Sequence, residues 1–299
     1  MRKMIPFAAM LIMAASKAQA QDAAVKDLQA SASKQVKSAE KDGWTKVGTL
    51  IINVNQGSLQ NWAGGGEQNT LGINAIFNYG LNYRKGENTW DNYFDLALGF
   101  QNATSYGRFR KTDDRIDITT KYGRQISQQW YASILANFNT QALRGFEYTS
   151  DSAIKISNIL SPGKLLLSPG LDFKPNKHLS VFFSPATVRW IFKKDPSFYR
   201  LTKFGVDSLK KSNYEMGAFL TAKYNQPLAK WATYTGRLDL FSNYRRNMGN
   251  IDVFFTNLLA LQFNKWLGST ISVDVVYDHD VVEKTQIKEI LGLGLTVKL

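Results

Sequence analysis

Residues 90–101 read WDNYFDLALGFQ, and this stretch decides the fold because its apolar and polar side chains fall on opposite parities. The even positions are mainly apolar, and the odd positions hold both carboxylates, Asp91 and Asp95. Successive side chains of a strand point to opposite faces, so this period of two predicts a strand with one apolar and one polar face. Residues 214–224 repeat the pattern, with Glu215 and Lys223 on the polar parity.

Similar segments recur along the chain. The candidate strands are residues 48–55, 71–83, 90–101, 116–122, 130–138, 164–173, 179–185, 214–224, 232–244, 251–263, 271–277 and 291–299. Strands of soluble sheets average about 5 or 6 residues, whereas about 9 to 11 cross a bilayer at a tilt, so length favours a membrane. The sequence therefore predicts an all-β fold, a closed antiparallel transmembrane β-barrel of about 12 strands. Residues 164–173 are its weakest member, because Pro169 cannot donate to a sheet ladder.

Short and long connections alternate between these segments, except that the connection at residues 244–250, which should be external, is short. Short ones lie near residues 84–89, 124–129, 174–178, 225–230 and 264–269, and longer ones near 56–68, 103–114, 140–162, 187–213 and 278–288. Bacterial barrels have short periplasmic turns and longer external loops, so both mature termini are expected in the periplasm. Aromatic residues beside the short turns, such as Trp90 and Trp130, predict an aromatic girdle there. Aromatic packing at the end of a soluble sheet is the alternative.

The N-terminus has the zones of a cleaved secretory signal: basic Arg2 and Lys3, an apolar run over residues 4–15, and small residues up to Ala20. We expect a signal peptide at 1–20, a flexible or partly helical periplasmic leader at 21–43, and an outer-membrane barrel at 44–299. Removing Arg2, Lys3 and Lys17 lowers the formal charge from +13 to +10. The chain has no cysteine, which excludes disulfides, thiolate chemistry and a lipid anchor on cysteine.

Residues 53–69 read NVNQGSLQNWAGGGEQN and resemble the opening of an uncharacterised outer-membrane β-barrel family of Bacteroidota, classed as a domain of unknown function. The resemblance covers residues 44–299, and NWAGGGE is its distinctive part. It implies a barrel and brings no activity or site residues. The final segment, LGLGLTVKL, resembles the terminal strand that the barrel assembly machinery recognises, with Leu299 in place of the usual aromatic residue.

Several short motifs in the sequence have either a functional or a plainer structural interpretation. Two tripeptides, DSA at 151–153 and DSL at 207–209, resemble the acceptor motif of the general O-glycosylation system of that phylum, which implies Ser152 and Ser208 as candidate sites. The glycines at 64–66 lack the Gly-Lys-Ser/Thr that a phosphate-binding loop needs, so an external loop is favoured. His279 lies between two aspartates, which is an unspecific pattern for a metal, and no serine is spaced to form a hydrolase site with it.

Charged side chains of both signs fall on the polar parity, which a barrel places inside. The candidate lumen-lining residues are Asp91, Asp95, Arg115, Asp117, Lys121, Lys164, Asp172, Glu215, Lys223, Arg237, Asp239, Asp252, Asp274 and Lys298. Their charges nearly balance, so they line a water-filled channel or cancel one another in a plugged lumen. Twelve strands lie between small filled barrels and wide porins, and both alternatives stay open.

The longest predicted loop, residues 187–213, holds apolar side chains among basic ones. A wholly solvated loop seldom holds so many, so we expect a constriction across the lumen, formed by Phe198, Tyr199, Arg200, Lys203 and Phe204. A docking surface for another protein is the alternative. Basic residues in this and other loops are expected to meet phosphates of outer-membrane lipid and lipopolysaccharide, or to attract anionic solutes.

Together these features favour a passive channel for small hydrophilic solutes in the cell outer membrane. An accessory or scaffold barrel of a surface complex, with other outer-membrane proteins as partners, is the alternative. An outer-membrane enzyme is less favoured, because no catalytic constellation is visible. No cofactor or metal is expected, and nucleic acid is not an expected partner of an exported barrel.

Overall fold

The computed structural model describes residues 42–58, 69–149, 152–176, 178–245, 248–264, 267–278 and 282–298. The expected signal peptide, almost all of the leader, the glycines at 64–66, His279 and Leu299 lie outside the described residues. No helix among the described residues is long and apolar enough to cross a membrane.

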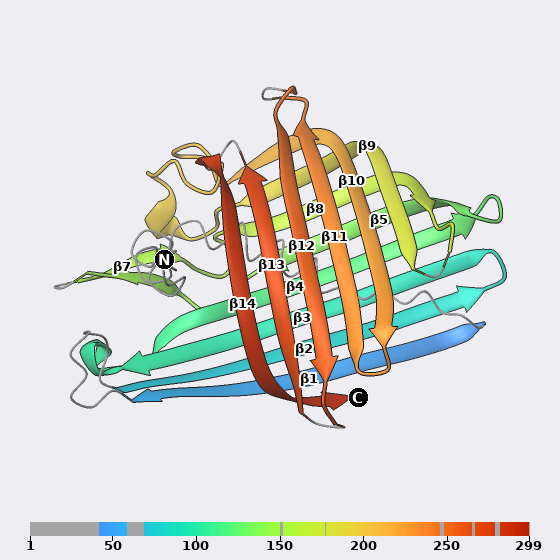
Figure 1. The fold of residues 1–299 in the computed structure, drawn as a ribbon. Coiled ribbons are helices and arrows are strands. Elements are labelled where there is room, and N and C mark those ends of the chain that lie inside the picture. The colour runs from blue at the N-terminus through green and yellow to red at the C-terminus, as the bar shows by residue number, and fades with distance from the viewer. Residues whose placement is uncertain are drawn as a thin grey trace, which may run out of the picture.

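Within the described residues, long antiparallel strands form one sheet that closes on itself (Figure 1). Its strands are β1 (Gly43–Ser58), β2 (Asn69–Lys85), β3 (Asn88–Ala103), β4 (Arg110–Gln125), β5 (Trp130–Thr140), β8 (Gly163–Phe173), β9 (Leu179–Phe192), β10 (Ser212–Ala229), β11 (Ala232–Asn243), β12 (Ile251–Gln262), β13 (Leu267–Asp278) and β14 (Val282–Lys298). A separate hairpin, β6 (Gly145–Tyr148) and β7 (Ala153–Ser157), lies between β5 and β8 in the chain.

Pairing of the first strand with the last closes the barrel. Thr49 to Ile52 of β1 lie opposite Lys298 to Leu295 of β14, and the remaining strands pair in chain order, with β5 joined to β8 past the hairpin. This pairing covers four residue pairs and turns the sheet into a barrel, which is the closed form in which a sheet can stand in lipid. The predicted all-β, closed antiparallel fold is confirmed.

The two faces of each strand differ as the alternation predicts. On β3, the outward Leu96 and Leu98 are each 39% exposed, whereas the inward Asp95 is fully buried. Outward apolar side chains recur on the other strands, for example Met216 on β10 and Phe255 on β12. An apolar band that faces out of a closed barrel is the surface that hydrocarbon solvates. The chain thus folds as a transmembrane β-barrel.

Aromatic side chains gather at the end of the barrel that carries the short turns. Trp44 of β1 packs against Tyr83 and Trp90, with ring centroids 4.9 and 6.0 Å away. Trp130 of β5 packs against Phe173 of β8 at 4.7 Å. The girdle predicted beside the short turns is therefore present at these strands, and the periplasmic orientation of that end stays a prediction.

One predicted loop boundary is wrong, because β9 continues to Phe192 whereas the loop was expected to begin at residue 187. The β8–β9 register shifts between Leu167 and Leu171, and the β9–β10 register shifts between Gly217 and Phe219. The two shifts mark a β-bulge in β9. One extra residue at Pro185 reverses the inward and outward positions of the later residues of this strand. A strand whose parity changes midway does not show a continuous alternation. For this reason the sequence predicts a loop over the second half of β9.

Other strands also extend beyond the predicted segments. β4 begins at Arg110 and β14 begins at Val282, in stretches that were expected to be long loops. A strand alternates apolar and polar residues only where one of its faces meets an apolar environment. At the ends of β4 and β14, polar residues occupy both faces. The same reasoning applies to β6 and β7, which lie inside the predicted loop 140–162.

Pro169 is accommodated in β8 as the sheet permits. It lies opposite Ile134 of β5, on the stretch where the ladder between β8 and β9 is interrupted by the register shift. A missing backbone N–H is tolerated at a bulge. The weakest predicted strand is therefore a strand.

Candidate functional site

The inward face of the barrel carries the charged side chains that the sequence assigned to it. Buried members are Asp91, Asp95, Asp117, Asp172, Glu215, Arg237, Asp239 and Asp252, and partly buried ones are Arg115, Lys121, Lys164 and Lys223. Asp274 and Lys298 lie in β13 and β14, but their side chains are not among those that the structure describes. The structure groups the described side chains into separate clusters.

The first cluster joins β3, β4 and β5. Arg115 donates to Oδ1 of Asp95 from Nη2 at 2.9 Å and from Nε at 3.3 Å. Next to it on β4, Asp117 accepts from Nδ2 of Asn137 at 2.8 Å and Nδ2 of Asn139 at 3.3 Å. Both carboxylates are therefore satisfied by donors from neighbouring strands, which a buried charge requires.

The second cluster lies toward the short-turn end and centres on Asp172 of β8. Its Oδ2 accepts from Nζ of Lys121 at 2.6 Å and from Nζ of Lys174 at 3.3 Å, and its Oδ1 accepts from the Ser180 hydroxyl at 2.8 Å. Lys174 also lies over the ring of Tyr131, 4.7 Å from its centroid. Desolvation lowers the pKa of the Lys174 ammonium, with Lys121 adding to the effect and Asp172 opposing it.

The third cluster occupies β9, β10 and β11. Arg189 donates from Nε to Oε2 of Glu215 at 2.6 Å and lies over the ring of Phe241, 4.6 Å from its centroid. Arg237 donates from Nε to the carboxylate of Asp239 at 2.7 Å. Sequence reasoning missed Arg189, because the sequence predicts a loop at this position. The bulge at Pro185 places Arg189 on the inward face of β9.

Several buried polar atoms in this wall have no hydrogen-bond partner among the described residues. Both carboxylate oxygens of Asp91 have no hydrogen bond, and the same holds for Nη1 of Arg237 and Oγ1 of Thr221. Buried polar groups are normally hydrogen-bonded, so each such exception needs a physical explanation.

The loop after β9 folds around a single ammonium group. Lys193 is fully buried, and its Nζ donates to the carbonyl oxygens of Leu201 at 2.5 Å, Asp207 at 2.9 Å and Val206 at 3.3 Å. At the base of the loop, the backbone N–H of Lys193 donates to the carbonyl of Lys211 at 2.8 Å. Three carbonyls from the far side of the loop converge on one cation, so the loop is a compact unit.

The candidate constriction residues lie in this compact loop. Phe198, in the short helical turn η3 (Pro196–Phe198), is buried and meets Phe204 edge to face at 5.6 Å. Lys203 lies over both rings, 4.7 and 5.3 Å from their centroids. Desolvation lowers the pKa of Lys203, and the Glu147 carboxylate offsets part of this effect. The rings of Phe198 and Phe204 are thus in contact with side chains of the loop itself.

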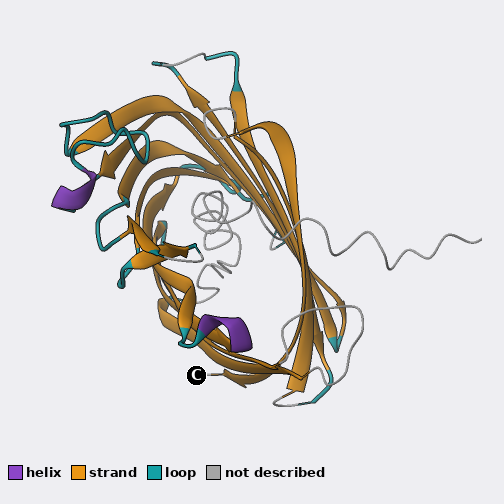
Figure 2. Ribbon diagram, turned by 90° about the vertical axis from the view of Figure 1, so that its left-hand side faces the viewer, coloured by secondary structure: helices purple, strands orange, loops and turns teal. Residues whose placement is uncertain are grey.

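The other two candidate constriction residues, Tyr199 and Arg200, lie outside this aromatic contact. Tyr199 donates from its hydroxyl to the carbonyl of Lys194 at 3.0 Å, and Arg200 is exposed. Figure 2 looks into the barrel from the end that carries this loop, and η3, the upper helical turn, lies at the outer edge of the wall. That a segment of this loop narrows the lumen stays a prediction.

The loop docks on the β6–β7 hairpin through Asp195. Its Oδ2 accepts from Nζ of Lys155 at 2.8 Å and from Nδ2 of Asn158 at 2.7 Å, and its Oδ1 accepts from the backbone and hydroxyl of Ser197. Burial alone would raise the pKa of this carboxyl, but the donors outweigh burial and hold its pKa well below the usual range. We call residues 145–161 and 193–211 together the platform.

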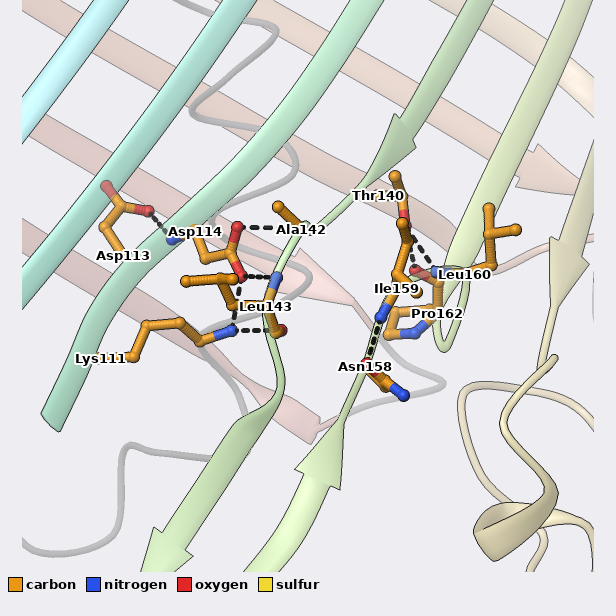
Figure 3. Close-up of polar contacts among 10 residues, drawn as sticks. All are labelled: Lys111, Asp113, Asp114, Thr140, Ala142, Leu143, Asn158, Ile159, Leu160 and Pro162. Atoms are coloured by element: carbon orange, nitrogen blue, oxygen red, sulfur yellow. Dashed lines mark hydrogen bonds and ion pairs between the residues drawn. The ribbon is translucent and has the colours of Figure 1, made fainter.

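The platform is fastened to the barrel wall by a second carboxylate, shown in Figure 3. Asp114 of β4 accepts from the backbone N–H groups of Ala142 at 2.9 Å and Leu143 at 2.7 Å, and from Nζ of Lys111 at 2.7 Å. On the returning chain, Leu160 donates from its N–H to the Thr140 hydroxyl at 3.0 Å. Both roots of the hairpin are therefore held.

Both candidate glycosylation sites lie on the platform. Ser152 is exposed, and its hydroxyl lies 2.8 Å from that of Thr149. Ser208 is also exposed, and its backbone N–H donates to the Thr202 hydroxyl at 3.3 Å. Their modification stays a prediction.

A closed antiparallel barrel with an apolar outer band and an inner wall of paired charges defines the class of an outer-membrane β-barrel. Residues 54–146 match the family described as "Protein of unknown function (DUF3078)", in agreement with the expected resemblance to an uncharacterised family. None of the curated proteins compared with the chain matches it.

Several solved structures are similar to the chain. The translocator domain of the autotransporter NalP from Neisseria meningitidis is 12% identical, with 95% of this chain and 99% of that chain covered at a TM-score of 0.46. An outer membrane channel from Pseudomonas putida F1 is 13% identical, with 89% and 98% covered at 0.44. The NanC porin is 9% identical, with 83% and 98% covered at 0.38.

Proposed function

We propose that this barrel is a narrow channel for small hydrophilic solutes across the outer membrane. The observation that supports the proposal is the inner wall itself, where ionised groups of both signs are paired between strands along the lumen. Asp95 with Arg115 and Asp172 with Lys121 belong to this row. A barrel that served only as an anchor would be stabilised as well by apolar side chains inside, since buried ion pairs add little stability over them.

The inner wall also carries bulky side chains that limit its width. Tyr93, Phe182, Phe241 and Phe254 point inward and are buried. Barrels of about twelve strands lie between those filled by side chains and those with a wide aqueous channel. Small solutes are therefore the expected cargo, and balanced wall charge predicts weak ion selectivity.

Conductance of the purified full chain in a planar bilayer tests this proposal. We expect discrete steps of one small size in potassium chloride. A preparation of the same chain that was denatured and never refolded is the control for detergent leaks. Folded protein that inserts without conducting would overturn the channel.

The constriction is tested by shortening the loop. Phe192 and Ser212 are partners in the β9–β10 register, so an Asn-Gly turn can replace residues 193–211 with little strain. A larger conductance step is expected if the loop narrows the path. An unchanged step would place the constriction elsewhere.

A scaffold function has one specific observation in its favour, the platform. Large apolar side chains are exposed on it, including Leu209 at 79%, and also Ile154, Ile159 and Leu201. Apolar residues grouped on a rigid surface suit a protein partner. Stoichiometric co-purification that is lost when residues 193–211 are replaced would favour this function.

A further inference from the structure

Asp91 of β3 is a buried carboxylate without hydrogen bonds. It points inward and is 2% exposed, and neither oxygen has a hydrogen-bond partner within the part of the chain that the structure describes. Lys121 lies directly opposite in the β3–β4 register, but its ammonium donates to Asp172. A carboxylate held in this way loses its hydration without gaining donors, which is unfavourable unless something binds to it.

The surroundings of Asp91 are rich in charge. The ammonium groups of Lys121, Lys174 and Lys223 interact with it electrostatically, yet none of them donates a hydrogen bond to it. Asp91 thus has nearby positive charge and lacks hydrogen-bond donors. A ligand that completes this site has to supply N–H or O–H groups.

The same ring of the wall holds donors and acceptors that are also unsatisfied. Lys223 of β10 lies opposite Arg237 of β11, whose Nη1 is buried without an acceptor. Thr221, two residues before Lys223 on the same face, has a buried hydroxyl without a partner. We call Asp91, Lys121, Lys174, Thr221, Lys223 and Arg237 the Asp91 ring.

The strands connect the Asp91 ring without a break. Lys121 and Lys174 share the Asp172 carboxylate, and Asp172 accepts from Ser180 of β9. Ser180 is in turn opposite Lys223 in the β9–β10 register. The ring therefore lines the lumen from β3 to β11 toward the short-turn end.

We propose that the Asp91 ring is a binding site for a neutral polyhydroxylated solute of the saccharide class. Vicinal hydroxyl groups both donate and accept, so a saccharide can donate to the Asp91 oxygens and accept from donors of the ring. The inference rests on the proposed channel for the route of the solute, but not for the binding itself.

Charge argues against the simpler ions. A metal cation would be repelled by the three ammonium groups and the guanidinium, and an inorganic anion would meet the Asp91 carboxylate. A neutral ligand avoids both penalties and uses the charged groups as strong hydrogen-bond partners. Ordered water satisfies the same groups and is the outcome against which the saccharide is tested.

Isothermal titration calorimetry of the detergent-purified full chain with maltose provides the test. We expect saturable binding to the native chain, weakened about tenfold or more in Asp91→Asn, because a charged acceptor is lost. Asp117→Asn is the matched control, since Asp117 faces inward from the next strand with oxygens that already accept from Asn137 and Asn139. Arg237→Gln serves as a second variant if Asp91→Asn does not fold.

Stability separates a binding role from a structural one. Asp91→Asn removes a buried charge that has no hydrogen bond, so the ligand-free variant is expected to resist heat as well as or better than the native barrel. Weaker maltose binding together with undiminished stability supports the site. Absence of maltose binding to the native chain, or equal binding by Asp91→Asn and the native chain, overturns it.

The channel and the site fail in different ways. Binding without conductance would retain the site and remove the channel. Conductance with no maltose binding would retain the channel and leave the Asp91 ring filled by water alone, which overturns the inference.

Discussion

Asp91 and Asp95 are the same residue type on the same face of the same strand, four positions apart, and they have opposite surroundings. Asp95 is fully buried and accepts two hydrogen bonds from Arg115. Asp91 is 2% exposed and accepts none from the residues that the structure describes. The first carboxylate belongs to the framework of the wall, and the second is the group that we propose to bind a solute.

The difference teaches that burial and charge alone do not identify a site in a barrel lumen. Most ionised groups of this wall are bound to one another, as Lys121 is to Asp172. Such pairs tie strands of the wall to one another and leave few hydrogen-bonding positions for a solute. What distinguishes a recognition group is a missing partner.

The largest effect is expected when the framework pair is broken. Arg115→Leu leaves the Asp95 carboxylate buried without its donors, which destabilises the barrel by about 3–5 kcal/mol. Urea titration of folding in lipid vesicles measures the loss. The double variant Asp95→Leu with Arg115→Leu is expected to recover most of it, and a double variant as unstable as the single one would contradict the pairing.

The next largest effect on stability is expected from a charge on the outward face of β3. Leu96, which follows Asp95 in the chain, faces outward and is 39% exposed. Leu96→Arg places a cation against hydrocarbon and is expected to destabilise the barrel by about 2–4 kcal/mol in the same vesicle titration. Leu96→Phe is the control and should fold normally; full stability of the arginine variant would mean that this face does not meet lipid.

The platform offers a smaller, pH-dependent effect. The pKa of Asp195 is lower in the folded chain than in the unfolded chain, so its contribution is present above the unfolded value of about 3.9 and is lost as the pH falls below it. A nitroxide on Arg200→Cys should become mobile at acid pH, and in Asp195→Asn it should be mobile already at neutral pH. Equal mobility in both chains at neutral pH would refute the docking role.

The smallest expected effect concerns ion selectivity. Asp91→Asn removes one negative charge from the lumen, so the ratio of potassium to chloride permeability is expected to fall by roughly threefold. Reversal potentials in a salt gradient measure it. Ser152→Asn, on an exposed site outside the wall, is the control and should leave the ratio unchanged.

Parity explains how much was predictable from the sequence. Each predicted strand has its counterpart in the barrel, and Asp95, Asp117 and Asp172 lie on the predicted inner face. The period of two is a local property, and a sheet with an apolar and a polar face preserves it. For that reason the fold and the composition of the wall could be read without knowing which strands pair.

Pairing itself could not be predicted, because it depends on register. The bulge at Pro185 interrupts the alternation, so the sequence predicts neither the second half of β9 nor the inward position of Arg189. The hairpin β6–β7 has too few residues to show a period of two. The special position of Asp91 depends on Lys121 turning to Asp172 of a distant strand. No local pattern in the sequence carries that information.

The division of each strand into a lipid face and a lumen face is tested most directly by spin labels on β3. The chain has no cysteine, so single variants at Tyr93, Phe94, Leu96, Ala97 and Leu98 can each carry one nitroxide without background. In lipid vesicles, collision rates with oxygen should be high at residues 94, 96 and 98 and low at residues 93 and 97. Equal oxygen accessibility on both parities would contradict the transmembrane barrel.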